Sequence, residues 1–145
     1  MSDLPAETCS CSALRQAARH VTKLYDEALA STGLGLNQYS ILSKLNRFGP
    51  KSLQALATLL VMDRSTLGHL LRPLERRGLV TLGVSETDRR SRVIALTPAG
   101  TQLMKEARPL WANAERRFER GFGVEDAVSL RTILRQVTAV AFDHA

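Results

Sequence analysis

Residues 63–98 read DRSTLGHLLRPLERRGLVTLGVSETDRRSRVIALTP, and this stretch decides the fold. In its first half, leucines recur three or four residues apart, which predicts a helix with one buried face. These leucines are Leu67, Leu70, Leu71 and Leu74. Asp63 is a residue type that caps helix starts, and Gly78 is one that caps helix ends. The segment between Asp63 and Gly78 is therefore expected to be one amphipathic helix.

Beyond Leu79 the apolar residues follow a period of two, which predicts short strands at 79–84 and 92–96. The polar residues between the strands predict a hairpin loop. A shorter helix is expected to begin at Ser52 and to end just before Asp63. Two helices joined by a short turn and followed by a charged hairpin form a winged helix-turn-helix. Its second helix fits the major groove of duplex DNA.

Helical periodicity flanks this core on both sides, so the fold class is expected to be mostly α with a small β-hairpin wing. The first eleven residues show no period and are expected to be a loose arm. Gly121 and Gly123 are expected to break the chain near its C-terminal end. The expected flanking helices are one over 14–29, one over 37–48 capped by Asn37, a long one starting at Thr97-Pro98, and a last one carrying residues 130–141.

The positive charge is concentrated in the centre of the chain. The 145 residues carry 20 Lys+Arg and 14 Asp+Glu, a net charge of +6. Between Lys44 and Arg92 there are ten basic and four acidic residues, whereas the two flanks are electrically balanced. A basic segment of this kind most often meets a polyanion.

Composition excludes several classes of protein. With 44% hydrophobic and 23% charged residues, the chain is neither disordered nor a membrane protein, and it lacks an apolar run long enough to span a bilayer. The N-terminus lacks the pattern of a signal peptide, and two cysteines make no disulfide framework, so a cytoplasmic location is expected. We see no catalytic motif and no metal-ligand spacing among His20, His69 and His144. Neither an enzymatic activity nor a cofactor is therefore expected.

DNA contacts are expected from two places. One is the exposed face of the second helix, with Arg64, Ser65, Thr66, Gly68, His69 and Arg72. The other is the hairpin tip, where Arg89 and Arg90 are long enough to reach a neighbouring minor groove. Arg76 and Arg77 also lie nearby, but cations are favoured at any helix C-terminus by the helix dipole.

Three motifs resemble the MarR family of bacterial transcription regulators. The most specific is the wing pattern D-x-R, five residues, L-T-x-x-G, which is present from Asp88 to Gly100. Met62-Asp63-Arg64-Ser65-Thr66-Leu67 resembles the start of the family's recognition helix, and Leu74-Glu75-Arg76-Arg77-Gly78-Leu79-Val80 resembles its exit. Helix order agrees from about Leu14 to the C-terminus, so the resemblance covers nearly the whole chain.

The resemblance implies a single domain, 1–145, with a winged helix-turn-helix core at 37–98 and dimerisation helices at 12–36 and 99–145. It implies a homodimer that binds a pseudo-palindromic operator and a repressor released by a small-molecule effector. Arg90 matches the arginine that enters the minor groove, and Asp88 matches the acid that braces the wing.

The family's effector pocket lies between the dimerisation helices and the winged domain. By position, the candidate pocket residues are Arg15, Arg19, His20, Tyr39 and Trp111. The sequence departs from the family at Gly68-His69, where many members have Thr-Arg.

Two alternatives remain open. Cys9 and Cys11 suggest a thiol-based redox sensor, whose reactivity depends on whether Arg15 or Arg19 lowers a thiol pKa. RNA binding or constitutive architectural binding predicts no preference for a palindromic duplex. An enzyme is the least supported class, because no catalytic motif stands out and Gly33-Leu34-Gly35 is far too weak a signal for a nucleotide loop.

Overall fold

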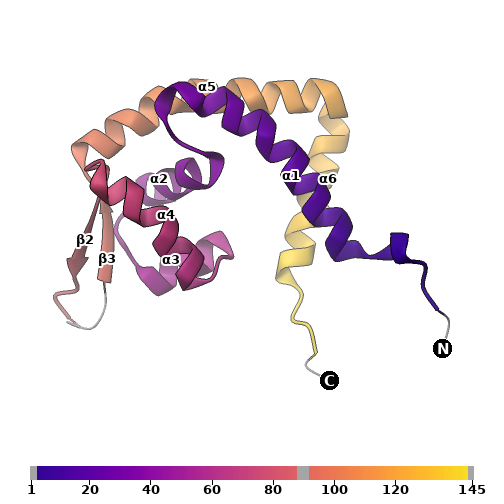
Figure 1. Ribbon diagram of the computed structural model, residues 1–145, viewed down its shortest axis with the longest axis horizontal. Helices are drawn as coiled ribbons and strands as arrows, with labels where there is room; N and C mark the ends of the chain where they lie inside the picture. Colours follow the sequence, from indigo (N-terminus) through magenta and orange to yellow (C-terminus); the bar gives the residue numbers. More distant parts are fainter. Residues whose placement is uncertain (1–2, 88–91, 144–145) are drawn as a thin grey trace.

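The computed structural model describes residues 3–87 and 92–143 and confirms a mostly helical chain with one small sheet. In Figure 1, α5 runs along the top, the sheet and α2 to α4 lie beneath its first half, and α1 and α6 lie beside its second half. In chain order the elements are η1 (Ala6–Thr8), α1 (Ser10–Leu29), η2 (Ala30–Thr32), α2 (Leu36–Phe48), β1 (Lys51–Ser52), α3 (Leu53–Leu60), α4 (Arg64–Arg76), β2 (Val80–Val84), β3 (Arg92–Leu96), α5 (Pro98–Phe122) and α6 (Val124–Ala139).

Three helix starts are set by side-chain caps that the sequence predicts. Ser52 Oγ accepts from the Ala55 amide at 3.1 Å, ahead of α3. Asp63 and Thr97 cap α4 and α5 in the same way. Each cap satisfies one of the backbone amides that a helix N-terminus leaves without a partner.

The start of α2 differs from the prediction. Asn37 is not the N-cap, because α2 begins one residue earlier, at Leu36, and is capped at Gly35. The Gln38 side chain accepts from the Gly35 amide at 3.2 Å, and Asp26 of α1 accepts from the Leu36 amide at 2.8 Å. The second contact comes from a residue ten positions away, so local capping preferences could not identify it.

The N-terminal segment is also more ordered than predicted. The 3-10 turn η1 spans Ala6–Thr8 and the helix α1 begins at Ser10 with Cys9 as its N-cap, so the prediction of a loose arm over the first eleven residues was wrong from Ala6 onward, while residues 1–2 lie outside the described residues. The Cys9 sulfur accepts from the Ser12 amide at 3.4 Å. The four residues by which α1 precedes the predicted start at Leu14 are all exposed, and without a buried face residues 10–13 show no apolar period.

The end of α5 differs from the prediction, because only one of the two glycines has a backbone conformation that ends the helix. Gly121 does not break the helix, since α5 continues to Phe122, and only Gly123 ends it. The φ of Gly123 is 113°, a conformation that favours glycine, whereas Gly121 keeps the helical backbone. At the other end of the last helix, α6 stops at Ala139 rather than at Ala141.

The sheet has three antiparallel strands in the order β1-β3-β2. The predicted hairpin is β2 and β3, paired from Val80 opposite Leu96 to Val84 opposite Arg92. The strand β1 adds Lys51 opposite Ile94. With only two residues, β1 is too short for a period of two to be visible in the sequence.

One tight junction fixes the hairpin and α5 against the end of α4. The helix α4 ends in a Schellman motif, in which the Leu79 amide donates to the Leu74 carbonyl at 2.9 Å and Gly78 has a φ of 73°. The Thr97 hydroxyl donates to the Gly78 carbonyl at 2.6 Å. A Cβ on Gly100 would lie 2.0 Å from the Leu79 carbonyl oxygen. The L-T-x-x-G pattern is therefore explained by a helix cap and a close backbone approach.

A single core joins the predicted DNA-binding unit to its neighbours. Its buried side chains begin in α1, at Leu29, and end in α5, at Ala107, so the core extends past both bounds of the 37–98 segment. A displacement of α5 would therefore disturb the packing of the helices beneath it. The buried residues are Leu29, Leu34, Tyr39, Ile41, Leu42, Leu45, Leu56, Ala57, Leu67, Leu71, Leu74, Leu79, Val80, Ile94, Met104 and Ala107.

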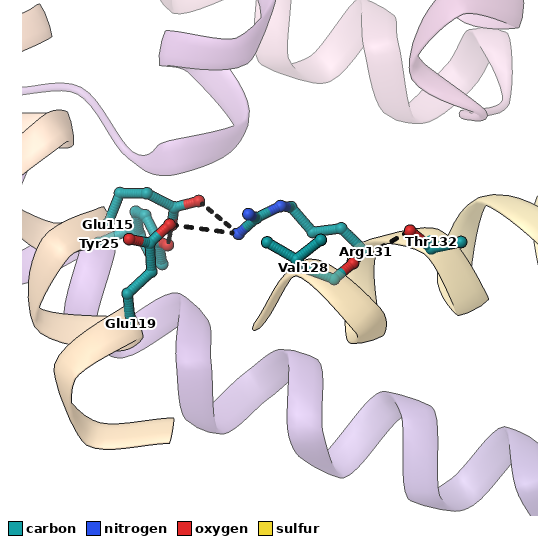
Figure 2. Close-up of polar contacts among 6 residues, drawn as sticks. All are labelled: Tyr25, Glu115, Glu119, Val128, Arg131 and Thr132. Atoms are coloured by element: carbon teal, nitrogen blue, oxygen red, sulfur yellow. Dashed lines mark hydrogen bonds and ion pairs between the residues drawn. The ribbon is translucent and has the colours of Figure 1, made fainter. Parts of the chain in front are cut away.

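A polar cluster ties together α1, α5 and α6 (Figure 2). The hydroxyl of Tyr25 in α1 donates to the Glu115 carboxylate in α5. In α6, Arg131 Nη1 lies 3.5 Å from carboxylate oxygens of both Glu115 and Glu119. Burial raises the pKa of Tyr25, and the hydrogen bond to Glu115 raises it further. The phenol thus stays protonated and keeps its role as a donor.

Candidate nucleic-acid interface and ligand pocket

The helix α4 presents one buried and one exposed face. Leu67, Leu71 and Leu74 are buried in the core. The predicted contact residues Arg64, Ser65, Thr66, His69 and Arg72 are all exposed. Of these, Ser65, His69 and Arg72 share the side directly opposite the buried leucines, because they are spaced by four and three residues. The exposed side of α4 therefore combines cations with small polar side chains.

The first turn of α4 is held by Asp63. Its carboxylate accepts from the Thr66 amide at 2.7 Å and from the Thr66 hydroxyl at 2.8 Å. These bonds lower the pKa of Asp63, the backbone bond first and the hydroxyl bond second. The Thr66 hydroxyl hydrogen is committed to the cap, so this side chain serves the helix start and has no free hydrogen for a phosphate.

The predicted wing residues Asp88, Arg89 and Arg90 lie outside the described residues. The strands that carry their loop are described up to the pair Val84 and Arg92. Because these two strands are antiparallel, the loop begins and ends at the same end of the β2–β3 hairpin.

The two arginines at the end of α4 have different roles. Arg77 donates to the Thr32 carbonyl at 2.9 Å and to the Gly33 carbonyl at 3.3 Å, which ties the end of α4 to η2. Arg76 is exposed and lies on the same side of α4 as Ser65 and His69. Arg77 therefore supports the fold, whereas Arg76 extends the basic side of α4.

A pocket of about 440 Å³ lies between α2 and α5. Tyr39 and Trp111 stack against each other in it, with ring centroids 6.0 Å apart and planes inclined by 20°. Polar side chains, three cations and one apolar side chain complete the lining: Ser40, Ser43, Lys44, Asn46, Arg47, Met104 and Arg108. Two of the five predicted effector residues, Tyr39 and Trp111, are thus brought together.

The pocket is electropositive. Its cations are Lys44, Arg47 and Arg108, and its lining residues include no carboxylate. Burial raises the pKa of Tyr39, while the charge of Arg108 opposes this shift. Aromatic surface beside several cations suits a planar anion. Sequence reasoning missed these three cations, because α2 and α5 are brought together only by the tertiary fold.

The other three predicted effector residues lie elsewhere. His20 lines a second hollow of about 480 Å³, formed by α1, α5 and α6 and dominated by apolar side chains such as Leu24 and Phe118. Arg15 and Arg19 are exposed on α1 and line neither hollow.

Both cysteines are exposed and carry free thiols. The hollow beside Cys9 is lined by Glu7, Ser12, Ala13 and Gln16. Neither Arg15 nor Arg19, which the sequence suggested as thiol-activating groups, lines that hollow.

In residues 3–87 and 92–143 no three His, Cys, Asp or Glu side chains are placed to hold a metal ion. Within the same ranges, none of the helices is long and apolar enough to cross a membrane.

Comparisons with known proteins agree with this architecture. A MarR family profile matches residues 34–91, which run from the approach to α2 into the wing loop. The organic hydroperoxide resistance transcriptional regulator of Bacillus subtilis (strain 168) is 32% identical over 97 residues, which are 67% of this chain and 66% of that relative. This chain belongs to the MarR family.

Solved MarR-like structures cover nearly the whole chain. The transcriptional repressor CouR, solved with a 23-mer DNA duplex, is 27% identical with a TM-score of 0.81, over 94% of this chain and 99% of that one. BpsR of Bordetella bronchiseptica, whose DNA binding is regulated by 6-hydroxynicotinic acid, is 21% identical with a TM-score of 0.84. That likeness covers 97% of this chain and 100% of BpsR. Both likenesses confirm the winged helix-turn-helix fold.

Proposed function

We propose that this protein is a sequence-specific regulator of transcription that binds duplex DNA through α4 and the wing. The observation that carries the proposal is the exposed side of α4, which combines Arg64, Ser65, His69 and Arg72 on a helix anchored by buried leucines. A helix of this kind fits the major groove and presents its side chains to bases and phosphates. We infer a cytoplasmic protein without enzymatic activity, in line with the regulators that it resembles.

The protein acts as a homodimer in this proposal. The helix α6 has apolar side chains that this chain leaves exposed, among them Val124, Val128 and Ile133. An apolar hollow between α1, α5 and α6 is lined by Leu130 of the same helix. A second copy would cover these surfaces, with residues 12–36 and 99–145 as the dimerisation helices and 37–98 as the DNA-binding core. Two recognition helices about 34 Å apart would then match a pseudo-palindromic operator.

The proposed signal is a small anion with a planar ring, bound between α2 and α5. Support comes from the stacked Tyr39 and Trp111 and from the three cations beside them. Regulation of BpsR by an aromatic acid is consistent with this chemistry. The shared core provides the coupling, since α5 contributes to the pocket and packs on the helices that carry α4. Occupation of the pocket would release the repressor from its operator.

The proposal is tested by DNA binding as a function of salt. The operator is first selected with the wild-type protein from a random-sequence duplex pool. The variant Arg72→Ala is expected to bind this duplex more weakly, with the slope of log K against log salt reduced by about 0.9 for one lost phosphate contact. Arg90→Ala, in the wing, should behave likewise.

Arg116→Ala is the matched control, because it removes the same charge from an exposed position on α5. Its slope should equal that of the wild type. If the wild type selects no duplex, or if Arg72→Ala binds with unchanged affinity and slope, α4 is not the DNA-reading element.

A thiol signal is the second candidate. It is favoured by the exposure of Cys9 and Cys11 and by the likeness to an organic hydroperoxide resistance regulator. Peroxide should then release the wild type from its duplex and leave the Cys9→Ser, Cys11→Ser double variant bound. A wild type that stays bound under peroxide removes this candidate.

A further inference from the structure

The fold of the chain does not explain why residue 68 is a glycine. It lies in the interior of α4, where glycine is among the least favourable residues, and its φ is not positive. A Cβ at this position would meet nothing within 4 Å. By contrast, Gly78 has a positive φ, and a Cβ on Gly100 would overlap the Leu79 carbonyl. Neither backbone conformation nor internal packing therefore requires a glycine at position 68.

The surroundings of Gly68 are basic. Arg64 and Arg72 precede and follow it by four residues, which places one guanidinium a turn away on each side. Ser65 lies three residues before it. Gly68 is partly exposed and lies at the margin of the exposed side of α4, so the absence of a side chain leaves the helix backbone uncovered there, between two cations that suit DNA.

We propose that Gly68 is a specificity-determining position, at which the backbone of α4 lies directly against a base edge in the major groove. Glycine is the residue that allows such a close approach, because any Cβ occupies the space that the ligand needs. The same glycine also lowers the stability of α4 in the unbound protein. Contact of the helix backbone with DNA would explain why a glycine stands there despite this loss of stability. This inference rests on the proposed function, since it requires that α4 enters the groove.

The variant Gly68→Ala separates the effect of Gly68 on helix stability from its proposed effect on DNA binding. It should raise the midpoint of chemical denaturation, because alanine is the better helix former. It should also lower the affinity for the duplex selected by the wild type at least tenfold, with a larger loss for Gly68→Thr. The affinity for a random duplex of equal length should change less than twofold, because phosphate contacts bring no sequence preference.

Gly121→Ala is the control, since it makes the same change inside α5, where a Cβ also meets nothing within 4 Å. Gly121 lines the apolar hollow that the second copy would cover, so light scattering first verifies that the oligomeric state is unchanged. With the dimer intact, this variant should raise stability without altering either affinity.

Four outcomes of these measurements can be distinguished. A loss confined to the selected duplex supports the proposal. Unchanged affinity of Gly68→Ala overturns it, and an equal loss on both duplexes overturns it in favour of an approach to the phosphates. A wild type that selects no duplex overturns the proposed function instead, and that result is seen before any variant is made.

Discussion

Asp63 illustrates how one side chain sets the geometry of the surface that we propose faces DNA. Its two bonds to Thr66 define the first turn of α4 and lower the pKa of the carboxyl group. A carboxyl whose pKa is lower in the folded state stabilises the fold above its unfolded pKa, and this stabilisation is lost as the pH falls through the folded pKa. The ionised cap is therefore fully effective at neutral pH.

We expect Asp63→Ala to lower the midpoint of thermal unfolding at pH 7. The difference from the wild type should shrink as the pH falls from the unfolded pKa of about 4 through the lower pKa of the folded state, because the carboxyl then becomes protonated in the folded protein as well. Asp63→Asn is the control, because an amide oxygen caps a helix without titrating. If Asp63→Ala lowers the midpoint of thermal unfolding by the same amount at neutral and at acid pH, the ionised cap does not have this role.

At the scale of elements, the junction between α4, the hairpin and α5 leaves no room for a side chain at Gly100. A Cβ would lie 2.0 Å from the Leu79 carbonyl oxygen, which is backbone and cannot rotate away. Gly100→Ala should therefore lower the free energy of unfolding by about 1–3 kcal/mol, as measured by urea denaturation. Gly121→Ala, also on α5, should raise it by up to about 1 kcal/mol. Equal stabilities of the two variants would show that the junction relaxes.

The elements differ in how well the sequence predicts them, and the reason is the range of the interactions. Caps at Ser52, Asp63 and Thr97 are predictable because donor and acceptor lie three residues apart. The entry to α2 is not, since it depends on Asp26 of α1. The start of α1 at Ser10 lacks a buried face and so has no apolar period to detect.

The residues of the candidate site also differ in how well the sequence predicts them. The exposed residues of α4 follow from helical spacing alone, so they could be named in advance. The cations of the pocket could not, because Lys44 and Arg108 are separated by 64 residues and meet only when α2 packs on α5. Arg77 looked equivalent to Arg76, and only its bonds to carbonyls of another element distinguish the two.

At the scale of the whole molecule, the central charge serves more than one surface. Arg64, Arg72 and Arg76 lie on α4, whereas Lys44 and Arg47 line the pocket. The two proposed anion-binding surfaces thus share one basic segment and one core, and α5 contributes to both the pocket and the core. Binding at either surface is expected to be linked to binding at the other.

Linkage requires that the two effects be equal in size. An aromatic acid that lowers the affinity for the operator by a given factor must itself bind the DNA complex more weakly by that factor, about 5- to 150-fold for typical regulators. Trp111 is the only tryptophan and lies in the pocket, so its fluorescence reports acid binding with and without duplex. Arg108→Ala should weaken acid binding and leave the affinity for duplex alone unchanged. Release of the operator by 6-hydroxynicotinic acid from both Arg108→Ala and wild type, at the same concentration, would place the effector outside this pocket.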